Sequence, residues 1–185
     1  TTSSPELPRM LPFVDKEALQ DLTSLRYARV IEVVLGFNEW KGMKLDGFGG
    51  LIPHKEQRDM LGVLFLSSFL KNRAPQNGAL LTIFMGGVRR DEMVDWPDDK
   101  IKEVVEREVK DLMQLDDFNP DLFHIKRYQE AIPQYMEDSG KRFETIEQLQ
   151  KAHPGLILGG NMRDGIGMAD RVKQARMLAE AVENE

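Results

Sequence analysis

The sequence predicts an α+β fold in which helices flank a mixed β-sheet. Three observations lead to this class. Apolar, β-branched runs of strand length recur between residues 27 and 129, and a strongly amphipathic helical pattern covers residues 97–113. The composition, with 41% hydrophobic and 30% charged residues over 185 positions, is typical of one ordinary folded domain.

The sheet is expected to contain five strands. The strongest pattern lies at 27–37, where Ile31 and Val33 belong to a nearly continuous apolar run, as in a strand that is buried on both faces. Pro133 cannot pair in a strand interior, so residues 131–135 are expected to be irregular. The other expected strands lie at 49–53, 60–67, 79–86 and 122–129.

Four helices are expected around this sheet. The helix at 97–113 places Ile101 and Val105 on one face and charged residues on the other, so it should pack on one face of the sheet. The final helix runs from Met168 to Val182 with apolar residues in heptad-like steps, so one of its faces should be buried. The remaining helical patterns lie at 15–25 and at 139–153, before Pro154-Gly155.

The charge and composition disfavour several classes of function. The net charge of -6 and the pI of about 5.2 disfavour general nucleic-acid binding, which needs a basic face. The absence of cysteine excludes disulfides and thiolate zinc sites, and the three histidines are too scattered for a persuasive metal site. No apolar run of 18 residues and no secretion leader are visible, so a cytoplasmic location is expected.

A glycine-rich turn before the last helix is the main candidate site. A short apolar strand is expected at 156–158, followed by GGN at 159–161 and by GIGM at 165–168, where the helix starts. Glycine lets a ligand approach the backbone, and a helix start offers unpaired N–H groups and a positive dipole end. This arrangement suits a cofactor, although a plain turn explains the same glycines. The dinucleotide fingerprint Gly-x-Gly-x-x-Gly is absent.

Other polar residues are better explained by solvent exposure. His54 is expected in an exposed loop and His124 on a solvent-facing side of a strand. Ser67 and Ser68 lack the context of a nucleophile elbow. The remaining candidates are the acidic pairs at 98–99 and 116–117, expected as solvated helix flanks, and the charges Arg89, Arg90, Lys126 and Arg127, which could bind a carboxylate.

Several stretches follow one another in the order of a known family. They are YARV at 27–30, GFGGLIP at 47–53, LGVLFLSS at 61–68 with NRAP at 72–75, and GG at 86–87. AIPQY at 131–135 looks like a motif particular to porphyrinogen oxidases, and GNMRDGIGMAD at 160–170 is similar to the final flavin-contacting motif. From about Leu11 onward, the chain resembles the C-terminal part of the oxygen-dependent protoporphyrinogen oxidase family, in the flavin-containing amine oxidase superfamily.

Departures from the family pattern refine this resemblance. Asn161 stands where the family usually has a small residue and where monoamine and polyamine oxidases usually have an acidic one, which favours a porphyrinogen over an amine. Ala175 replaces a usual Gly and Arg171 a frequent Cys, changes that a helix surface could tolerate. The N-terminal dinucleotide-binding fold does not occur in the sequence, so the chain is interpreted as a C-terminal fragment.

The resemblance implies an FAD-dependent oxidase that converts a porphyrinogen to a porphyrin and passes electrons to oxygen, giving hydrogen peroxide. Residues 1–154 would form most of the substrate-binding sheet region, and residues 155–185 would complete the FAD site. Phe48 is the candidate to stack on a tetrapyrrole ring, or else an ordinary core residue. The implied FAD contacts, largely through the backbone, are Gly160, Asn161, Gly165, Ile166, Gly167 and Met168.

The implied partners are a porphyrinogen, molecular oxygen and the missing N-terminal FAD-binding half, without nucleic acid. Peripheral association of the full-length enzyme with a membrane is compatible with the same resemblance. The isolated chain is expected to be inactive and to bind FAD weakly, because most of the cofactor surface would stay exposed. Two alternatives remain open: a superfamily enzyme acting on coproporphyrinogen, an amine or a carotenoid, and a non-catalytic α+β binding domain.

Overall fold

The computed structural model describes residues 3–183, which fall into two compact units. The sheet unit consists of residues 29–131, and the helical unit consists of the described residues in 1–28 and 132–185. The division expected at residue 154 separates a substrate part from a flavin part. Because that division concerns function and the two compact units concern packing, the division at residue 154 stays a prediction.

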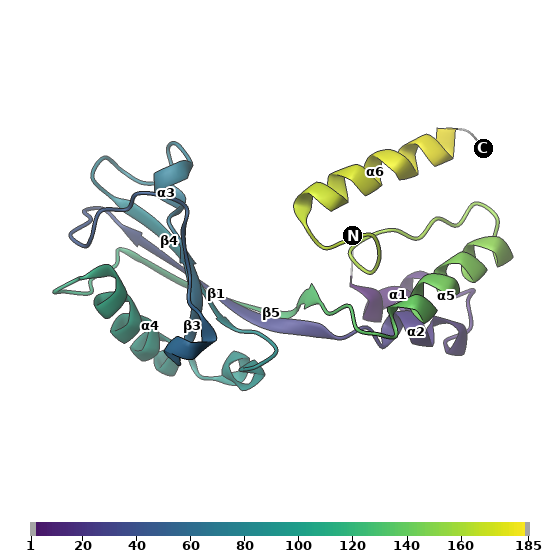
Figure 1. Ribbon diagram of the computed structural model, residues 1–185, viewed down its shortest axis with the longest axis horizontal. Coiled ribbons are helices and arrows are strands. Elements are labelled where there is room, and N and C mark those ends of the chain that lie inside the picture. Colours follow the sequence, from purple (N-terminus) through teal and green to yellow (C-terminus); the bar gives the residue numbers. More distant parts are fainter. Residues whose placement is uncertain (1–2, 184–185) are drawn as a thin grey trace. The chain divides into compact units, whose positions relative to one another are not determined.

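The sheet unit is built on five strands in the order β2-β3-β4-β1-β5, which matches the α+β class expected from the sequence (Figure 1). β1 pairs antiparallel with β4, β4 with β3, and β3 with β2. In the β1–β4 register, Val33 lies opposite Ile83. The strands are β1 (Tyr27–Phe37), β2 (Gly49–Leu51), β3 (Met60–Leu64), β4 (Ala79–Gly86) and β5 (Leu122–Pro133).

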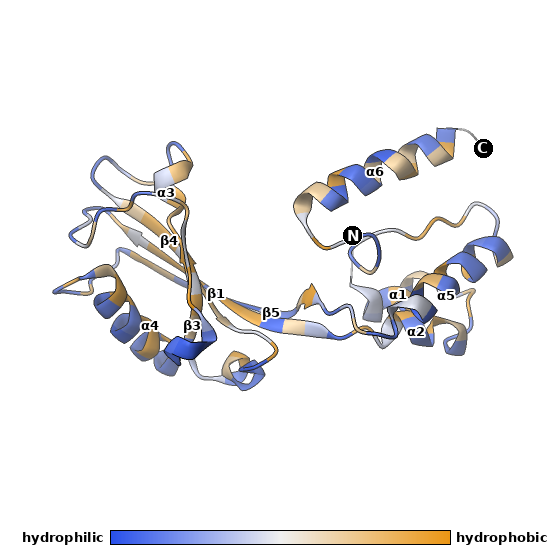
Figure 2. Ribbon diagram, in the orientation of Figure 1, coloured by the Kyte–Doolittle hydropathy of each residue, from blue (hydrophilic) through white to orange (hydrophobic). Residues whose placement is uncertain are grey.

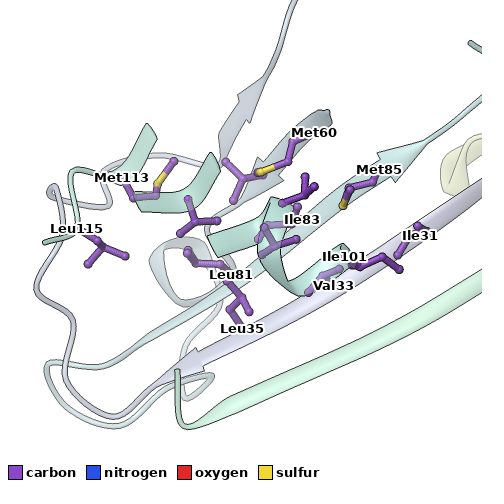
Figure 3. Packing of buried hydrophobic residues seen from close by; sticks show 14 of the residues in the cluster. Ile31, Val33, Leu35, Met60, Leu81, Ile83, Met85, Ile101, Met113 and Leu115 are labelled. Atoms are coloured by element: carbon purple, nitrogen blue, oxygen red, sulfur yellow. The ribbon is translucent and has the colours of Figure 1, made fainter. Parts of the chain in front are cut away.

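One face of the sheet carries the core of this unit, because helix α4 (Asp98–Met113) covers it. Ile101 and Met113 of α4 join Ile31, Val33 and strand residues of β3 and β4 in one buried cluster (Figure 3). This confirms the helix expected at 97–113 and its packing on the sheet. Pro97 stands just before the helix as its N-cap, with extended backbone.

The expectation that β1 is buried on both faces was wrong. Along most of β1, fully buried residues alternate with half-buried ones. Ile31 and Val33 are completely buried against the α4 layer, whereas Glu32 and Val34 on the other side are only half-buried. A helix layer on one face alone is therefore sufficient to account for the burial pattern.

The strand expected at 60–67 ends earlier, at Leu64, and is followed by a helical turn, α3 (Leu66–Phe69). The Leu70 N–H donates to the Leu66 carbonyl over 3.0 Å, so the chain closes on itself here. A short apolar run is compatible with a strand or a helical turn, and periodicity does not distinguish the two. The other short elements of this unit are the 3-10 helices η3 (His54–Glu56) and η4 (Asp91–Asp95).

The helical unit has a core of its own. Leu19 and Leu22, from the expected helix at 15–25, pack with Ile146 of α5 and are completely buried, as is Ile146 itself. Helix α5 confirms the amphipathic helix expected at 139–153. The elements are η1 (Ser4–Glu6), α1 (Leu7–Met10), η2 (Glu17–Leu19), α2 (Gln20–Thr23), α5 (Ser139–Ala152) and α6 (Met168–Glu183).

Residues 131–135 are more regular than expected, because β5 continues to Pro133. Proline is tolerated there because β5 is an edge strand of the sheet. The next residue, Gln134, donates its N–H to the Arg26 carbonyl over 2.8 Å.

Two expectations near the C-terminus were wrong. Residues 156–158 form no strand; they are irregular, and the Leu158 N–H donates to the Gln150 side chain over 2.8 Å instead of to a neighbouring strand. Helix α6 exists over the expected range, but of its described residues only Gln174 is buried. Val172 and Val182 are exposed, so apolar and polar residues both face outward along α6 (Figure 2). No described element covers these apolar side chains.

None of the helices within residues 3–183 is long and apolar enough to cross a membrane.

Candidate functional site

The glycine loop, residues 159–167, joins the end of the helical unit's core to α6. Three of its residues have left-handed backbone: Gly160 at φ 111°, Asp164 at φ 60° and Gly165 at φ 96°. A side chain at Gly165 would also overlap the Asp170 carboxylate. Glycine is therefore required at Gly165 by both backbone conformation and space.

The start of α6 is capped from within the helix. The Asp170 carboxylate accepts the Gly167 N–H over 3.1 Å, and the Arg171 N–H donates to the Gly167 carbonyl over 3.1 Å. Among the described residues, the N–H groups of Met168 and Ala169 form no hydrogen bond. These free donors and the helix dipole make the start of this 16-residue helix favourable for an electronegative ligand atom.

Tyr135 and Arg142 bind the carbonyls of Asn161 and Met162 in the loop. The Tyr135 hydroxyl donates to the Asn161 carbonyl at 2.8 Å and lies 3.2 Å from the Gly165 carbonyl. The buried Arg142 donates its Nε–H to the Met162 carbonyl over 2.9 Å. Burial raises the pKa of Tyr135, so this phenol stays a hydrogen-bond donor.

Arg171 of α6 holds the next three carbonyls. Its Nη2 lies 2.9 Å from the carbonyl oxygens of Arg163 and Asp164 and 2.8 Å from that of Gly165. Together with Tyr135 and Arg142, Arg171 therefore binds every backbone carbonyl from residue 161 to residue 165. Side chains thus make most of the hydrogen bonds that hold the carbonyls of this loop; one backbone bond, from the Arg163 N–H to the Gly160 carbonyl over 3.4 Å, adds to them.

Gln174 closes the loop from the buried side of α6. Its Oε1 accepts the Gly160 N–H over 2.7 Å, and its Nε2 donates to the Asp164 carboxylate over 2.7 Å. Burial alone would raise the pKa of Asp164, but the Gln174 hydrogen bond and the charges of Arg163 and Arg171 outweigh it and lower that pKa. Asp164, an exposed residue, is thus held as an anion at the surface of the loop.

The outer side of the loop is open. A Cβ atom added at Gly160 would meet nothing within 4 Å, and the side chains of Ile166 and Met168 are 49% and 85% exposed. Free backbone donors thus lie beside exposed apolar side chains. This combination suits a flat ligand with an electronegative edge.

Phe48 belongs to the sheet unit, whereas the six expected cofactor residues all belong to the helical unit. Phe48 is 70% exposed, so it is not the ordinary core residue that the sequence left open. Its ring lies 4.7 Å from that of Phe69, centre to centre, and Leu51 nearby in the chain is 89% exposed. Phe48 is therefore available for contact with a ligand.

Other candidates from the sequence have structural or exposed roles. Ser67 and Ser68 accept the backbone N–H groups of Leu80 and Gly47. Arg127 donates to the Val94 and Trp96 carbonyls and to Asp98, so its guanidinium already has hydrogen-bond partners within the fold. His54 and His124 are exposed as expected. Within residues 3–183 no group of histidine, aspartate or glutamate is arranged to hold a metal ion.

Sequence reasoning missed the four side chains that hold the loop. Tyr135 lay in the AIPQY motif and Arg171 was noted only as a departure from the family pattern. Arg142 and Gln174 lie on amphipathic helices whose pattern gave no sign of a role. Their function depends on contacts across the turn, which residue spacing does not reveal.

Comparison with known proteins places this site in context. The sequence profile of a family described as flavin containing amine oxidoreductase matches residues 1–182. The mitochondrial protoporphyrinogen oxidase of Nicotiana tabacum is 32% identical over 141 residues, which are 75% of this chain and 28% of the relative. Protoporphyrinogen oxidase 2 of Arabidopsis thaliana, chloroplastic or mitochondrial, is 29% identical over 89% of this chain and 33% of the relative.

A further relative has a different named substrate. The coproporphyrinogen III oxidase of Bacillus subtilis (strain 168) is 26% identical over 86% of this chain and 34% of the relative. The chain thus spans about a quarter to a third of the length of the curated relatives it matches.

Solved structures agree on the fold. A crystal structure from Exiguobacterium sp. 255-15, assigned provisionally as a protoporphyrinogen oxidase, superposes with a TM-score of 0.79 at 20% identity. The superposition covers 99% of this chain and 40% of that one. Reduced UDP-galactopyranose mutase superposes with a TM-score of 0.56 at 11% identity, covering 82% of this chain and 33% of that one. At these identities the likeness concerns the fold alone.

Proposed function

The chain belongs to the flavin-containing amine oxidoreductase family, and from this premise we propose that it is the C-terminal part of an FAD-dependent protoporphyrinogen oxidase. The whole enzyme would convert protoporphyrinogen IX to protoporphyrin IX with oxygen as acceptor. An N-terminal half, which would bind most of the FAD, and a peripheral association with a membrane are parts of the same proposal. The names of the matched relatives from two plants support the substrate class.

The observation that carries the proposal is the open outer side of the glycine loop. FAD, when bound, supplies the hydride acceptor and the reaction with oxygen. The pyrimidine edge of a flavin is electronegative, which fits the free N–H groups at the start of α6. The residues proposed to contact it, largely through their backbone, are Gly160, Asn161, Gly165, Ile166, Gly167 and Met168.

This chain contributes positioning and not acid–base chemistry in the proposal. The loop orients the flavin edge, while the exposed Ile166 and Met168 exclude water from the side they cover. Phe48 is proposed as an apolar wall against the substrate, since a flat tetrapyrrole binds well to aromatic surfaces.

The proposal is tested with the full-length protein. We expect a purified yellow protein with a bound flavin spectrum, which oxidises protoporphyrinogen IX aerobically with the appearance of porphyrin fluorescence and hydrogen peroxide. A protein purified without flavin that also takes up none on addition of FAD would refute the cofactor assignment. A flavoprotein that leaves protoporphyrinogen IX unchanged would refute the substrate assignment alone.

Coproporphyrinogen III is the second candidate substrate, because one matched relative is named for it. The two substrates are compared by kcat/KM in the same assay. A higher kcat/KM for protoporphyrinogen IX supports the first proposal, and a higher value for coproporphyrinogen III replaces it with the second.

Phe48 is tested by Phe48→Ala in the full-length enzyme. Loss of one stacked ring corresponds to about 0.5–1.5 kcal/mol, so KM is expected to rise by roughly twofold to tenfold with flavin content unchanged. The matched control is Phe13→Ala, since Phe13 is 61% exposed in the helical unit. Equal kinetic constants for wild type and Phe48→Ala would remove Phe48 from the substrate site.

A further inference from the structure

Five successive carbonyls of the glycine loop, those of residues 161–165, are bound by the side chains of Tyr135, Arg142 and Arg171, and this fixes where the adjoining N–H groups point. In a planar trans peptide the C=O and N–H bonds point in opposite directions. The carbonyls of Arg163, Asp164 and Gly165 converge on a single nitrogen, Nη2 of Arg171. The N–H groups of the same three peptides, those of Asp164, Gly165 and Ile166, therefore point away from Arg171.

These three N–H groups are free within the described part of the chain. Among residues 3–183, none of them forms a hydrogen bond with a backbone or side-chain acceptor. Three successive outward N–H groups form a concave donor array of the kind that binds anionic or electronegative atoms. The left-handed backbone at Asp164 and Gly165 is part of this arrangement.

We propose that Arg171, assisted by Tyr135, is a positioning residue that turns the peptides of the glycine loop so that their N–H groups face the flavin. This inference rests on the proposed function, because it assigns the outer side of the loop to FAD. Arg171 acts through the backbone of residues 163–165 and does not itself contact the cofactor.

The surroundings of Arg171 support a fixed guanidinium. Its Nη1 donates to Gln174 Oε1 over 2.6 Å, and that oxygen also accepts the Gly160 N–H. Its Nε is buried and has no acceptor among the described residues, an arrangement that costs free energy. The fork of arginine lets Nη1 donate to Gln174 while Nη2 reaches the three carbonyls; the single nitrogen of lysine, with three N–H donors, could serve the carbonyls but not Gln174 as well.

The orientation of these donors would matter more for the reduced flavin than for the oxidised one, because negative charge builds on the pyrimidine edge on reduction. If the loop N–H groups lose their fixed orientation, both oxidised and reduced flavin should bind more weakly, and the reduced flavin should lose more affinity. If the reduced form loses tenfold more affinity than the oxidised form, the two-electron midpoint potential falls by about 30 mV.

The test uses the full-length holoenzyme with three variants. Arg171→Met keeps an unbranched side chain as far as the position of Nε but removes all donors, and Tyr135→Phe removes only one hydroxyl. Arg176→Met is the matched control, since Arg176 lies on the same helix, is 82% exposed and, of residues 3–183, pairs with Glu180 alone. The readouts are the dissociation constant of FAD, the visible spectrum of the bound flavin, its midpoint potential, and the Tm of the flavin-free protein.

We expect Arg171→Met to raise the FAD dissociation constant by roughly tenfold and to lower the midpoint potential, with a smaller change of the same sign in Tyr135→Phe. Arg171→Lys keeps donors for the three carbonyls, so it should recover part of the midpoint potential together with part of the Tm. The inference is overturned if Arg171→Met lowers only the Tm while its flavin keeps the wild-type potential and spectrum. Should Arg171→Met not fold, an unchanged potential in Tyr135→Phe overturns it equally. A wild-type protein that binds no FAD refutes the proposed function instead.

Discussion

At the scale of single residues, two glycines of the loop make different demands on the backbone. Both Gly160 and Gly165 have positive φ, so a side chain at either position strains the chain by about 1–2 kcal/mol. The two positions differ in the room they leave for a side chain: a Cβ at Gly160 meets nothing within 4 Å, whereas a Cβ at Gly165 overlaps the carboxylate of Asp170. Asp170 would have to move and release the Gly167 N–H that it caps.

We therefore predict that Gly165→Ala destabilises the full-length protein by about 1–3 kcal/mol more than Gly160→Ala does. Urea unfolding of the two variants measures the difference. If the flavin lies against the loop, Gly165→Ala should also lower the flavin midpoint potential, because the free N–H groups move away from it. A lowered Tm with an unchanged flavin content and potential would instead indicate that Gly165 serves only the turn.

Asp164 gives a prediction for pH dependence. Its folded pKa is lowered, so the ionised side chain stabilises the folded state fully above the unfolded pKa of about 3.9. That stabilisation is lost as the pH falls through the lower folded pKa. We predict that Asp164→Asn is less stable than wild type at pH 7 and that the difference shrinks below about pH 4.

The substitution isolates the charge, because asparagine tolerates the left-handed backbone that Asp164 adopts. The control is Asp15→Asn, which changes an exposed carboxylate of the helical unit. Denaturant titrations between pH 3 and 7 check the prediction, with the range set around the ordinary carboxyl pKa of about 3.9. A difference between wild type and Asp164→Asn that does not vary with pH would contradict it.

At the scale of elements, α4 stabilises the sheet unit by packing on one face of the sheet. Ile101 is completely buried in that layer, so Ile101→Ala is predicted to cost about 2–5 kcal/mol. Glu103→Ala, on the exposed side of the same helix, should change the free energy of unfolding by less than about 0.5 kcal/mol. Similar costs for the two variants would mean that α4 does not form the core layer described above.

Elements with a strong local pattern could be predicted from the sequence, and those that depend on partners could not. The bounds of β1 follow from a long β-branched run, and α4 follows from its amphipathic spacing. The helical turn at Leu66–Phe69 was missed because a few apolar residues fit strand and helix equally. The residues at 156–158 were expected to pair, but no described strand lies beside them.

At the scale of the whole molecule, each unit has its own core. Some features of the proposed site could be predicted from the sequence, and others could not. The glycine positions could be predicted because positive φ and close approach favour glycine. The hydrogen bonds from side chains to five successive carbonyls could not be predicted, because Tyr135, Arg142 and Arg171 come from segments separated in sequence. The family resemblance expected no role for Arg171, yet it makes three of the loop's hydrogen bonds.

The central claim is that the outward N–H groups of the glycine loop and of the α6 start face the flavin. It is tested most directly by a structure of the full-length protein with FAD bound. We predict that a pyrimidine carbonyl oxygen of the flavin lies about 2.7–3.2 Å from the backbone nitrogen of Ile166 or Met168. A flavin whose pyrimidine edge is held by another segment, with these nitrogens facing solvent or protein, would contradict the account.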